Sequence, residues 1–284
     1  MLLEIYRQKF EKELCKGIER FGEKSRLRDA CEYALMCGGK RLRPLIVMMT
    51  ADALNNGLDV MPAACSVEFF HTASLIADDL PCMDNDDMRR NRPSLHKTFG
   101  EATALLASYT LIAEGYGAIH LNGERMRNKA LANEAALLCL AAATRCAGIL
   151  GATSGQFLDL FPPDSSWETI QKVIKQKTVT LFEISFIFGW LFGGGDKARL
   201  KDLQDTAFHL GMAFQIADDL DDVPQDGKSG VNIASILGRE KANALFEENI
   251  AAFKNSLEGL CLWTKPFQEL YEALLRTRTL SLLG

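Results

Sequence analysis

The sequence predicts an all-α fold, a single domain of long helices spanning residues 1–284. Apolar residues recur at helical spacing along almost the whole chain. No alternating Val/Ile/Thr run between turn residues indicates a strand. No linker, low-complexity tract or fixed-period repeat divides the chain, and 48% hydrophobic residues in 284 are enough for a sizeable core.

The first helix is predicted from an apolar residue at every fourth position: Leu2, Tyr6, Phe10, Leu14 and Ile18. Glycine, proline and asparagine clusters separate the later helical runs. Those runs cover residues 41–54, 60–79, 100–121, 128–151, 166–192, 197–222, 238–257 and 265–282. Long helices of this kind can surround a deep cavity, with its mouth where helices carrying polar clusters end.

Composition narrows the function classes. A net charge of −5 argues against general affinity for nucleic acid or anionic membranes. The most apolar stretch, 181–192, contains Glu183 and is too short to span a bilayer, so stable membrane insertion is not expected. The eight cysteines include no CxxC pair, and the first residues lack a signal-peptide core. We therefore expect a soluble cytoplasmic protein.

An acidic cluster follows an apolar run near three quarters of the chain. At about 100° per residue, Asp218, Asp219 and Asp222 fall on one helix face with Gln215. Asp221 lies off that face. Mg²⁺ prefers oxygen ligands and commonly bridges carboxylates to a substrate phosphate. The stripe therefore predicts a Mg²⁺ site, whereas a solvated acidic helix end is the plainer interpretation.

A second acidic cluster lies near one third of the chain. His71, Ser74 and Asp78 share a helix face. Pro81 disfavours helix at the preceding residue, so the helix should end or kink there. Asp84 would point about 240° away from Asp78 on a straight helix. Only a bulged or looped segment brings Asp84 back to Asp78, and the residues around Pro81 supply one.

Basic residues accompany both clusters. The segment 38–44, GGKRLRP, is not a P-loop; it is a tight turn that delivers Lys40 and Arg43 to one place. Arg and Lys side chains of this kind bind phosphate oxygens. Arg89, Arg90 and Arg92 form a second set, and Lys177-Thr178 a weaker one. Since no triad for nucleophilic hydrolysis is recognisable, these sets predict phosphorylated substrates held through cations.

Taken together, the segments resemble the trans-isoprenyl diphosphate synthase family. Two long motifs at family spacing carry the resemblance, and shorter ones support it. In chain order they are GGKRLRP at 38–44, HTASLIADDLPCMDNDDMRRNRPSLHKTFGE at 71–101, GQFLD at 155–159, QKT at 176–178 and FQIADDLDD at 214–222. The central motif is most similar to the geranylgeranyl type of plants and bacteria.

The resemblance implies mostly antiparallel helices around a deep central cavity, usually in a homodimer. It implies Mg²⁺ bound by six carboxylates: Asp78, Asp79 and Asp84, with Asp79 supporting, and Asp218, Asp219 and Asp222. It assigns to the allylic diphosphate (dimethylallyl, geranyl or farnesyl) Arg89, Lys177, Thr178, Gln215 and Lys228. It assigns to isopentenyl diphosphate Lys40, Arg43, His71 and Arg90. The implied reaction is their Mg²⁺-dependent head-to-tail condensation, with the carboxylates and Lys177 promoting it.

Product length should follow from what blocks the cavity floor. Ala73 and Ser74 lie one turn before Asp78, and Phe70 lies two turns before it, roughly 12 Å away. Family members that stop at fifteen carbons tend to carry an aromatic residue one turn before. Small residues there predict the twenty-carbon product, geranylgeranyl diphosphate, although Phe70 is equally compatible with ordinary core packing.

Two departures from the family pattern keep alternatives open. Asn91-Arg92 replaces the usual Gly-Lys, and the chain reads GVNIA at 230–234 where a second lysine is expected. A missing cation next to the diphosphate is compatible with a catalytically weak regulatory subunit of a heteromeric synthase. A farnesyl diphosphate synthase is the other alternative. A class I terpene cyclase has no need of the GGKRLRP segment and is disfavoured.

Overall fold

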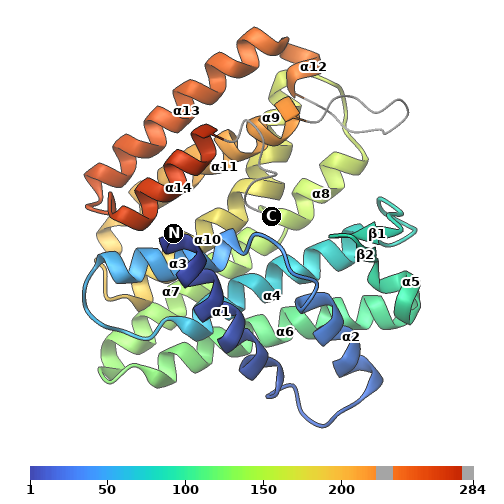
Figure 1. Cartoon of the computed structure of the whole chain (residues 1–284), viewed down its shortest axis with the longest axis vertical. Coiled ribbons are helices and arrows are strands. Elements are labelled where there is room, and N and C mark those ends of the chain that lie inside the picture. Colours follow the sequence, from blue (N-terminus) through green and yellow to red (C-terminus); the bar gives the residue numbers. More distant parts are fainter. Residues whose placement is uncertain (222–232, 277–284) are drawn as a thin grey trace.

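A computed structural model of the protein describes residues 1–221 and 233–276, and confirms the predicted all-α fold (Figure 1). The helices, in chain order, are Leu2–Ile18 (α1), Arg26–Leu35 (α2), Leu42–Ala53 (α3), Met61–Asp78 (α4), Leu95–Phe99 (α5), Glu101–Arg125 (α6), Lys129–Ala147 (α7), Ala152–Leu160 (α8), Trp167–Ile174 (α9), Thr180–Phe192 (α10), Leu200–Asp221 (α11), Ile233–Leu237 (α12), Arg239–Gly259 (α13) and Lys265–Arg276 (α14). A π-helical turn, Lys175–Val179 (η1), separates α9 from α10, and a 3₁₀ turn, Lys197–Arg199 (η2), precedes α11.

Most predicted helices agree with the structure to within a few residues, because apolar period and capping residues act together. Ser25 caps α2 by accepting a hydrogen bond from the Arg28 N–H, and Asn128 and Ser166 cap α7 and α9 in the same way. The predicted run 166–192 differs, since η1 divides it. Helices α2, α5, α8 and α12 were not predicted, because each is short and its apolar pattern covers few turns.

A short ribbon interrupts the helical pattern. Met88–Arg89 (β1) pairs antiparallel with Arg92–Pro93 (β2), and Arg90 and Asn91 between them have φ angles of 51° and 61°. Two consecutive left-handed residues match the twist of a two-residue hairpin, and Asn tolerates this conformation well. Strands of two residues cannot show an alternating pattern, so the sequence analysis did not indicate them.

Helix α10 forms the centre of the core. It packs against α3, α4, α7 and α11, and every one of its residues is buried. Helix α4 packs against α10, and α4 and α6 run side by side (Figure 1). They approach closely because Ser66 donates to the Gly115 carbonyl over 2.7 Å, Ser108 donates to the Ala73 carbonyl over 2.9 Å, and Gly115 has no Cβ. These contacts thus hold the C-terminal end of α4 against α6.

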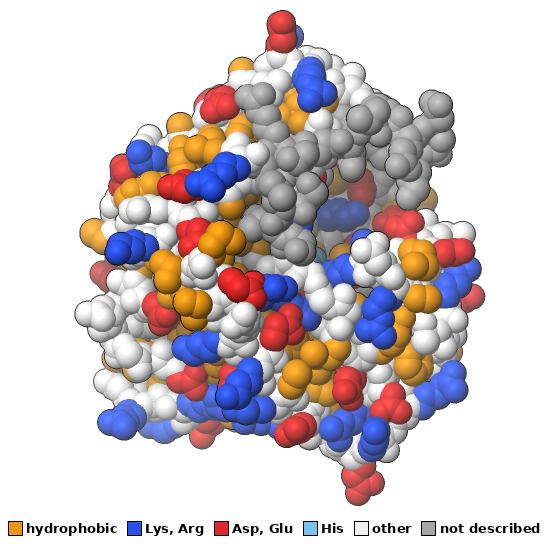
Figure 2. All heavy atoms as spheres, viewed as in Figure 1, with side chains coloured by type: hydrophobic (Ala, Val, Ile, Leu, Met, Phe, Trp, Pro, Cys, Tyr) orange, Lys and Arg blue, Asp and Glu red, His pale blue; other side chains and the backbone are white. Residues whose placement is uncertain are grey.

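One apolar segment passes a length and composition test for crossing a membrane. It runs from Lys129 to Leu160, and 33% of its most apolar window is buried within the fold. The structure divides it into α7 and α8 at residues 148–151. The stretch considered in the sequence analysis, 181–192, lies in α10 and is core. The apolar side chains exposed on α7 include Leu137 and Leu140. On the face of the molecule shown in Figure 2, acidic and basic side chains are scattered among apolar ones.

Candidate active site

The first acidic cluster surrounds the end of α4. After Asp78 the chain turns, and the Asp84 N–H donates to the Asp78 carbonyl over 2.9 Å. This contact returns Asp84 to the helix end, as the sequence analysis expected of a looped segment. Asp84 is exposed, whereas Asp78 is half-buried. Burial, and then the charge of the neighbouring Asp84, raises the pKa of Asp78, and a bound cation would relieve the repulsion.

Asp79 forms an ion pair with Arg89 of the hairpin. It is 3% exposed, and the Arg89 guanidinium donates to it from Nε over 2.9 Å and from Nη2. Arg89 also reaches Asp86 over 3.4 Å. The ion pair with Asp79 therefore fixes Arg89 beside Asp78 and places the β1–β2 hairpin at the site.

The charge of Asp78 gives a pH prediction. Burial, with Asp84 and Asp79 nearby, raises the Asp78 pKa from its ordinary 3.8 to about 6, although Lys177 opposes the shift. The protonated form is thus favoured in the folded state. The stabilisation that protonated Asp78 contributes to the folded protein is complete below the unfolded-state pKa. It is lost as the pH rises through the folded-state pKa of about 6.

We expect the metal-free protein to lose about 1 kcal/mol more than its Asp78→Asn variant between pH 5 and pH 7. Denaturant unfolding in the presence of a chelator at both pH values measures this difference. Parallel pH dependence of the two proteins would contradict the shifted pKa.

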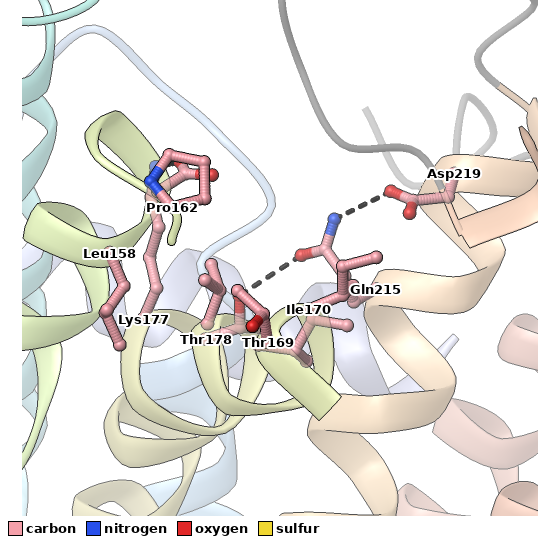
Figure 3. A pocket seen from close by; sticks show the side chains of 11 residues that line it. Leu158, Pro162, Thr169, Ile170, Lys177, Thr178, Gln215 and Asp219 are labelled. Carbon is pink, nitrogen blue, oxygen red and sulfur yellow. Dashed lines mark hydrogen bonds and ion pairs between the residues drawn. The ribbon is translucent and has the colours of Figure 1, made fainter. Parts of the chain in front are cut away.

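The turn η1 brings the second acidic cluster to the same place. Thr178 Oγ1 donates to Gln215 Oε1 over 3.1 Å, and Gln215 Nε2 donates to Asp219 Oδ1 over 2.9 Å (Figure 3). The Ile233 N–H donates to the other Asp219 oxygen over 2.8 Å. These side chains, with Asp159 and Lys177, line a cavity of about 170 Å³.

Lys177, the residue before Thr178, connects this cavity to Asp78. Its Nζ donates to Asp159 over 2.6 Å. Burial works against its charge, but Asp159, Asp78 and Asp84 together raise its pKa. Two consecutive residues of the π-helical turn η1 therefore reach different partners: Lys177 donates to Asp159 and is influenced by the charges of Asp78 and Asp84, whereas Thr178 donates to Gln215, which in turn donates to Asp219. Such turns are frequent at functional sites.

The basic turn supplies donors from the other side. The Arg43 guanidinium lies 4.6 Å from the Phe182 ring centre, and its Nη1 is 3.3 Å from His71 Nε2. Because a guanidinium only donates, His71 Nε2 accepts and Nδ1 carries the proton. Burial, then Arg43, lowers the His71 pKa well below 6.5, so the ring is neutral. Arg43 Nε and His71 Nδ1 are buried and have no hydrogen-bond partner in the described structure.

Arg90 joins the basic turn to the hairpin. Its Nη1 donates to the Gly38 carbonyl, and its guanidinium lies against Gly39. A Cβ at Gly39 would lie 2.4 Å from Arg90 Cζ, and Gly38 and Gly39 have φ angles of 78° and 115°. The glycine pair is therefore required twice, for its backbone conformation and for the approach of Arg90. Lys40 follows directly and is half-buried.

The three proposed chain-length residues do not all face the same way. Ser74 is half-buried on the face of α4 that carries His71 and Asp78. Ala73 is 1% exposed, and its carbonyl accepts from Ser108 of α6. Phe70 packs edge-on against Tyr116, with ring centres 5.1 Å apart, and over Gly115. Ser74 is thus the small residue on the face of the acidic cluster.

The remaining predicted residues are placed as follows. Asp218 is half-buried on α11, and its charge acts on Arg43. Asp222 and Lys228 lie outside the described residues, as does Asn232.

Asp159 was not selected from the sequence, although it ends the GQFLD segment. The spacing Gly155-x-x-x-Asp159 is a usable signal: a Cβ at Gly155 would lie 2.4 Å from the Lys177 backbone N, so the glycine lets α8 bring Asp159 to η1.

The donor set fits a Mg²⁺ ion that is completed by substrate. In the described residues no group of three or more His, Cys, Asp or Glu side chains forms a ready-made site. Mg²⁺ is usually held by one or two carboxylates, waters and phosphate oxygens, not by an all-protein cage. Asp78 and Asp84, whose mutual repulsion a cation relieves, and Asp218 and Asp219 across η1 are suitable ligands of this kind.

An all-α fold that combines aspartates at helix ends with unpartnered buried donors fits the class of helical enzymes that hold phosphates through cations. The sequence model of the polyprenyl synthetase family matches residues 24–235. The chain belongs to this family, as the sequence analysis predicted.

Similar proteins and solved structures support the same family membership. A farnesyl diphosphate synthase of Geobacillus stearothermophilus is 35% identical over 256 residues, covering 88% of this chain and 84% of that protein. A heterodimeric geranylgeranyl pyrophosphate synthase large subunit of Arabidopsis thaliana is 31% identical over 251 residues, 86% of this chain but 64% of that protein. The crystal structure of a geranyltransferase from Legionella pneumophila superposes with a TM-score of 0.83 at 28% identity, covering 96% of this chain and 95% of that one.

Proposed function

We propose that this chain condenses isopentenyl diphosphate with an allylic diphosphate to give geranylgeranyl diphosphate. Membership of the family makes it a trans-prenyltransferase. The observation that supports two diphosphate positions is the arrangement of donors: Lys177 and Thr178 lie on the side of the acidic clusters, whereas Arg43 and His71 present unpartnered buried nitrogens. Half-buried Ser74 at the acidic face supports the longer product.

The proposed roles follow from position. Arg89, Lys177, Thr178 and Gln215 bind the allylic diphosphate, and Lys40, Arg43, His71 and Arg90 bind isopentenyl diphosphate. Asp78, Asp84, Asp218 and Asp219 would hold Mg²⁺, which when bound would supply positive charge that favours ionisation of the allylic C–O bond. The isopentenyl double bond would then attack the allylic cation to form the new C–C bond, and the proton lost from the isopentenyl unit would pass to the released pyrophosphate. Fixed cations such as Lys177 stabilise the leaving group without reorganisation, and apolar walls protect the cation from water.

Product analysis tests the proposal. The purified protein is incubated with Mg²⁺, labelled isopentenyl diphosphate and each of the dimethylallyl, geranyl and farnesyl primers, and the products are sized. Twenty-carbon product is expected from each primer. Accumulation at fifteen carbons favours the farnesyl alternative, which the Geobacillus relative also suggests. No elongation by the isolated protein would favour a regulatory subunit.

We propose further that the chain forms a homodimer through α6 and α7. Large apolar side chains are exposed along both helices and the segment after α7: Leu105, Leu106, Tyr109, Ile112, Leu131, Leu137, Leu140, Ile149 and Leu150. Monomeric soluble proteins rarely expose contiguous patches of this kind. A second copy would cover the same patch on both subunits, as two-fold symmetry requires.

A charge in this patch should separate the subunits. We expect Leu137→Glu combined with Leu140→Glu to halve the mass measured by sedimentation, because two buried carboxylates would be unpaired. Ile5→Glu, at an equally exposed apolar residue of α1, should leave the mass unchanged. A wild-type monomer, or a dimer that survives both glutamates, would contradict this interface.

A reducing, cytoplasmic location completes the proposal. All eight cysteines are free thiols, and four of them, Cys31, Cys65, Cys139 and Cys146, are buried. Buried thiols behave as small hydrophobic side chains, which suits a reducing compartment.

A further inference from the structure

A buried carboxylate lies beneath the basic turn. Glu68 belongs to α4, and its side chain is 1% exposed. Arg41 Nη1 donates to Glu68 Oε1, and the Arg41 side chain is 0% exposed. A pair buried this deeply contributes little net stability, because the cost of desolvating both charges offsets their attraction. The functional importance of the pair therefore lies in the position in which it holds Arg41.

Arg41 binds three parts of the fold at once. Besides Glu68, its Nε donates to Glu11 Oε1 of α1 over 2.7 Å, and its Nη2 donates to the Leu35 carbonyl at the end of α2. Its own backbone is left-handed, with φ 51°, a strained conformation for a residue with a long side chain. The contacts of the guanidinium hold that conformation, which turns the chain between Lys40 and Arg43.

The Glu68 charge also acts on the neighbouring guanidiniums. Burial lowers the pKa of Arg43 to about 10 and lowers that of Arg90, while the Glu68 carboxylate is the first charge that opposes both shifts. Glu68 therefore faces three arginines, of which Arg41 is its direct partner. Lys177 and Thr178, by contrast, are held by Asp159 and Gln215.

We propose that Glu68 is a positioning residue for one substrate only: it anchors Arg41 and so presents Lys40 and Arg43 to isopentenyl diphosphate. This inference rests on the proposed function, in which those two residues bind that diphosphate. The allylic diphosphate is assigned to side chains that other residues hold. A substitution at Glu68 should therefore weaken binding of isopentenyl diphosphate and leave binding of the allylic diphosphate unchanged. A merely structural role would lower both affinities together.

The test compares Michaelis constants for the two substrates. We expect Glu68→Ala to raise the KM for isopentenyl diphosphate about tenfold, the loss of one charge-assisted hydrogen bond, with the allylic KM within about twofold of wild type. Glu68→Gln keeps an acceptor oxygen and should lose less. Arg41→Lys keeps the charge but not the three-way fork, so it should resemble Glu68→Ala.

Glu183→Gln is the control, because Glu183 is also a buried carboxylate paired with an arginine, the more exposed Arg145, but belongs to α10 and not to the turn at 38–44 or its anchor. It should change neither KM. Equal changes in both constants for Glu68→Ala and Arg41→Lys, or none, would overturn the inference. If Glu68→Ala does not fold, Glu68→Gln and Arg41→Lys carry the test.

The inference and the proposed function fail in different ways. If the wild-type protein makes no elongated product, the proposed function is wrong. Calorimetric titration of isopentenyl diphosphate alone into the protein then still tests the role of Glu68. Weaker binding by Glu68→Ala than by wild type supports it, and equal binding refutes it.

Discussion

Asp78→Asn should reduce the kcat for elongation by about 10³-fold, the typical cost of removing one group that stabilises developing charge. The amide keeps the shape of the carboxylate, so packing at the end of α4 is retained. It removes a proposed metal ligand and the negative charge that Asp84 and Lys177 face. Initial rates at saturating substrate over a range of Mg²⁺ concentrations measure the effect, and extra Mg²⁺ should not restore it.

Asp87→Asn provides the control for that experiment. Asp87 belongs to the same acidic segment, but it is exposed and pairs with Lys97 over 2.7 Å. A surface ion pair of this kind contributes little. We expect a rate within about twofold of wild type. A loss of less than tenfold for Asp78→Asn would place the metal ligands elsewhere.

Ser74→Phe should shorten the product from twenty to fifteen carbons. Ser74 lies one helical turn before Asp78 on the half-buried face of α4, about 6 Å along the helix. An aromatic ring at this distance would occupy the space into which the prenyl chain grows. Chromatographic sizing of products from the geranyl and farnesyl primers measures the shift. The farnesyl primer should then be elongated poorly.

Ala73→Tyr is a second test of the same floor. Because Ala73 faces α6 and is 1% exposed, the tyrosine ring must displace α6 or turn toward the proposed path of the prenyl chain, so stability should fall along with product length. Ala102→Phe introduces a ring on the exposed start of α6 and should leave product length unchanged. If Ser74→Phe still yields twenty carbons, the floor lies at another position.

The sequence predicted the helices and motifs well where local pattern decides the structure. The apolar period located α3, α4, α6 and α11, and the 240° offset of Asp84 correctly required a looped return. The partners of the site residues depend on contacts distant in sequence. Asp159 is 18 residues from Lys177, and Glu68 is 27 residues from Arg41. Periodicity carries no information on such pairs.

The β1–β2 ribbon and the π-helical turn also could not be predicted from the sequence. The first depends on a two-residue left-handed conformation at Arg90-Asn91, and the second on packing of η1 between α8 and α11. Neither changes the apolar period enough to be recognised. The glycines nevertheless marked the important approaches, since Gly39 and Gly155 each lie where a methyl group would collide.

The π-helical turn has a consequence for protein engineering. A π-helical turn accommodates more residues than an α-helical one, so deleting one residue within 175–179 should restore regular α-helical winding. Lys177 and Thr178 would then point in new directions relative to Asp159 and Gln215, their present partners. The shortened chain should therefore lose both contacts, although neither side chain has been replaced.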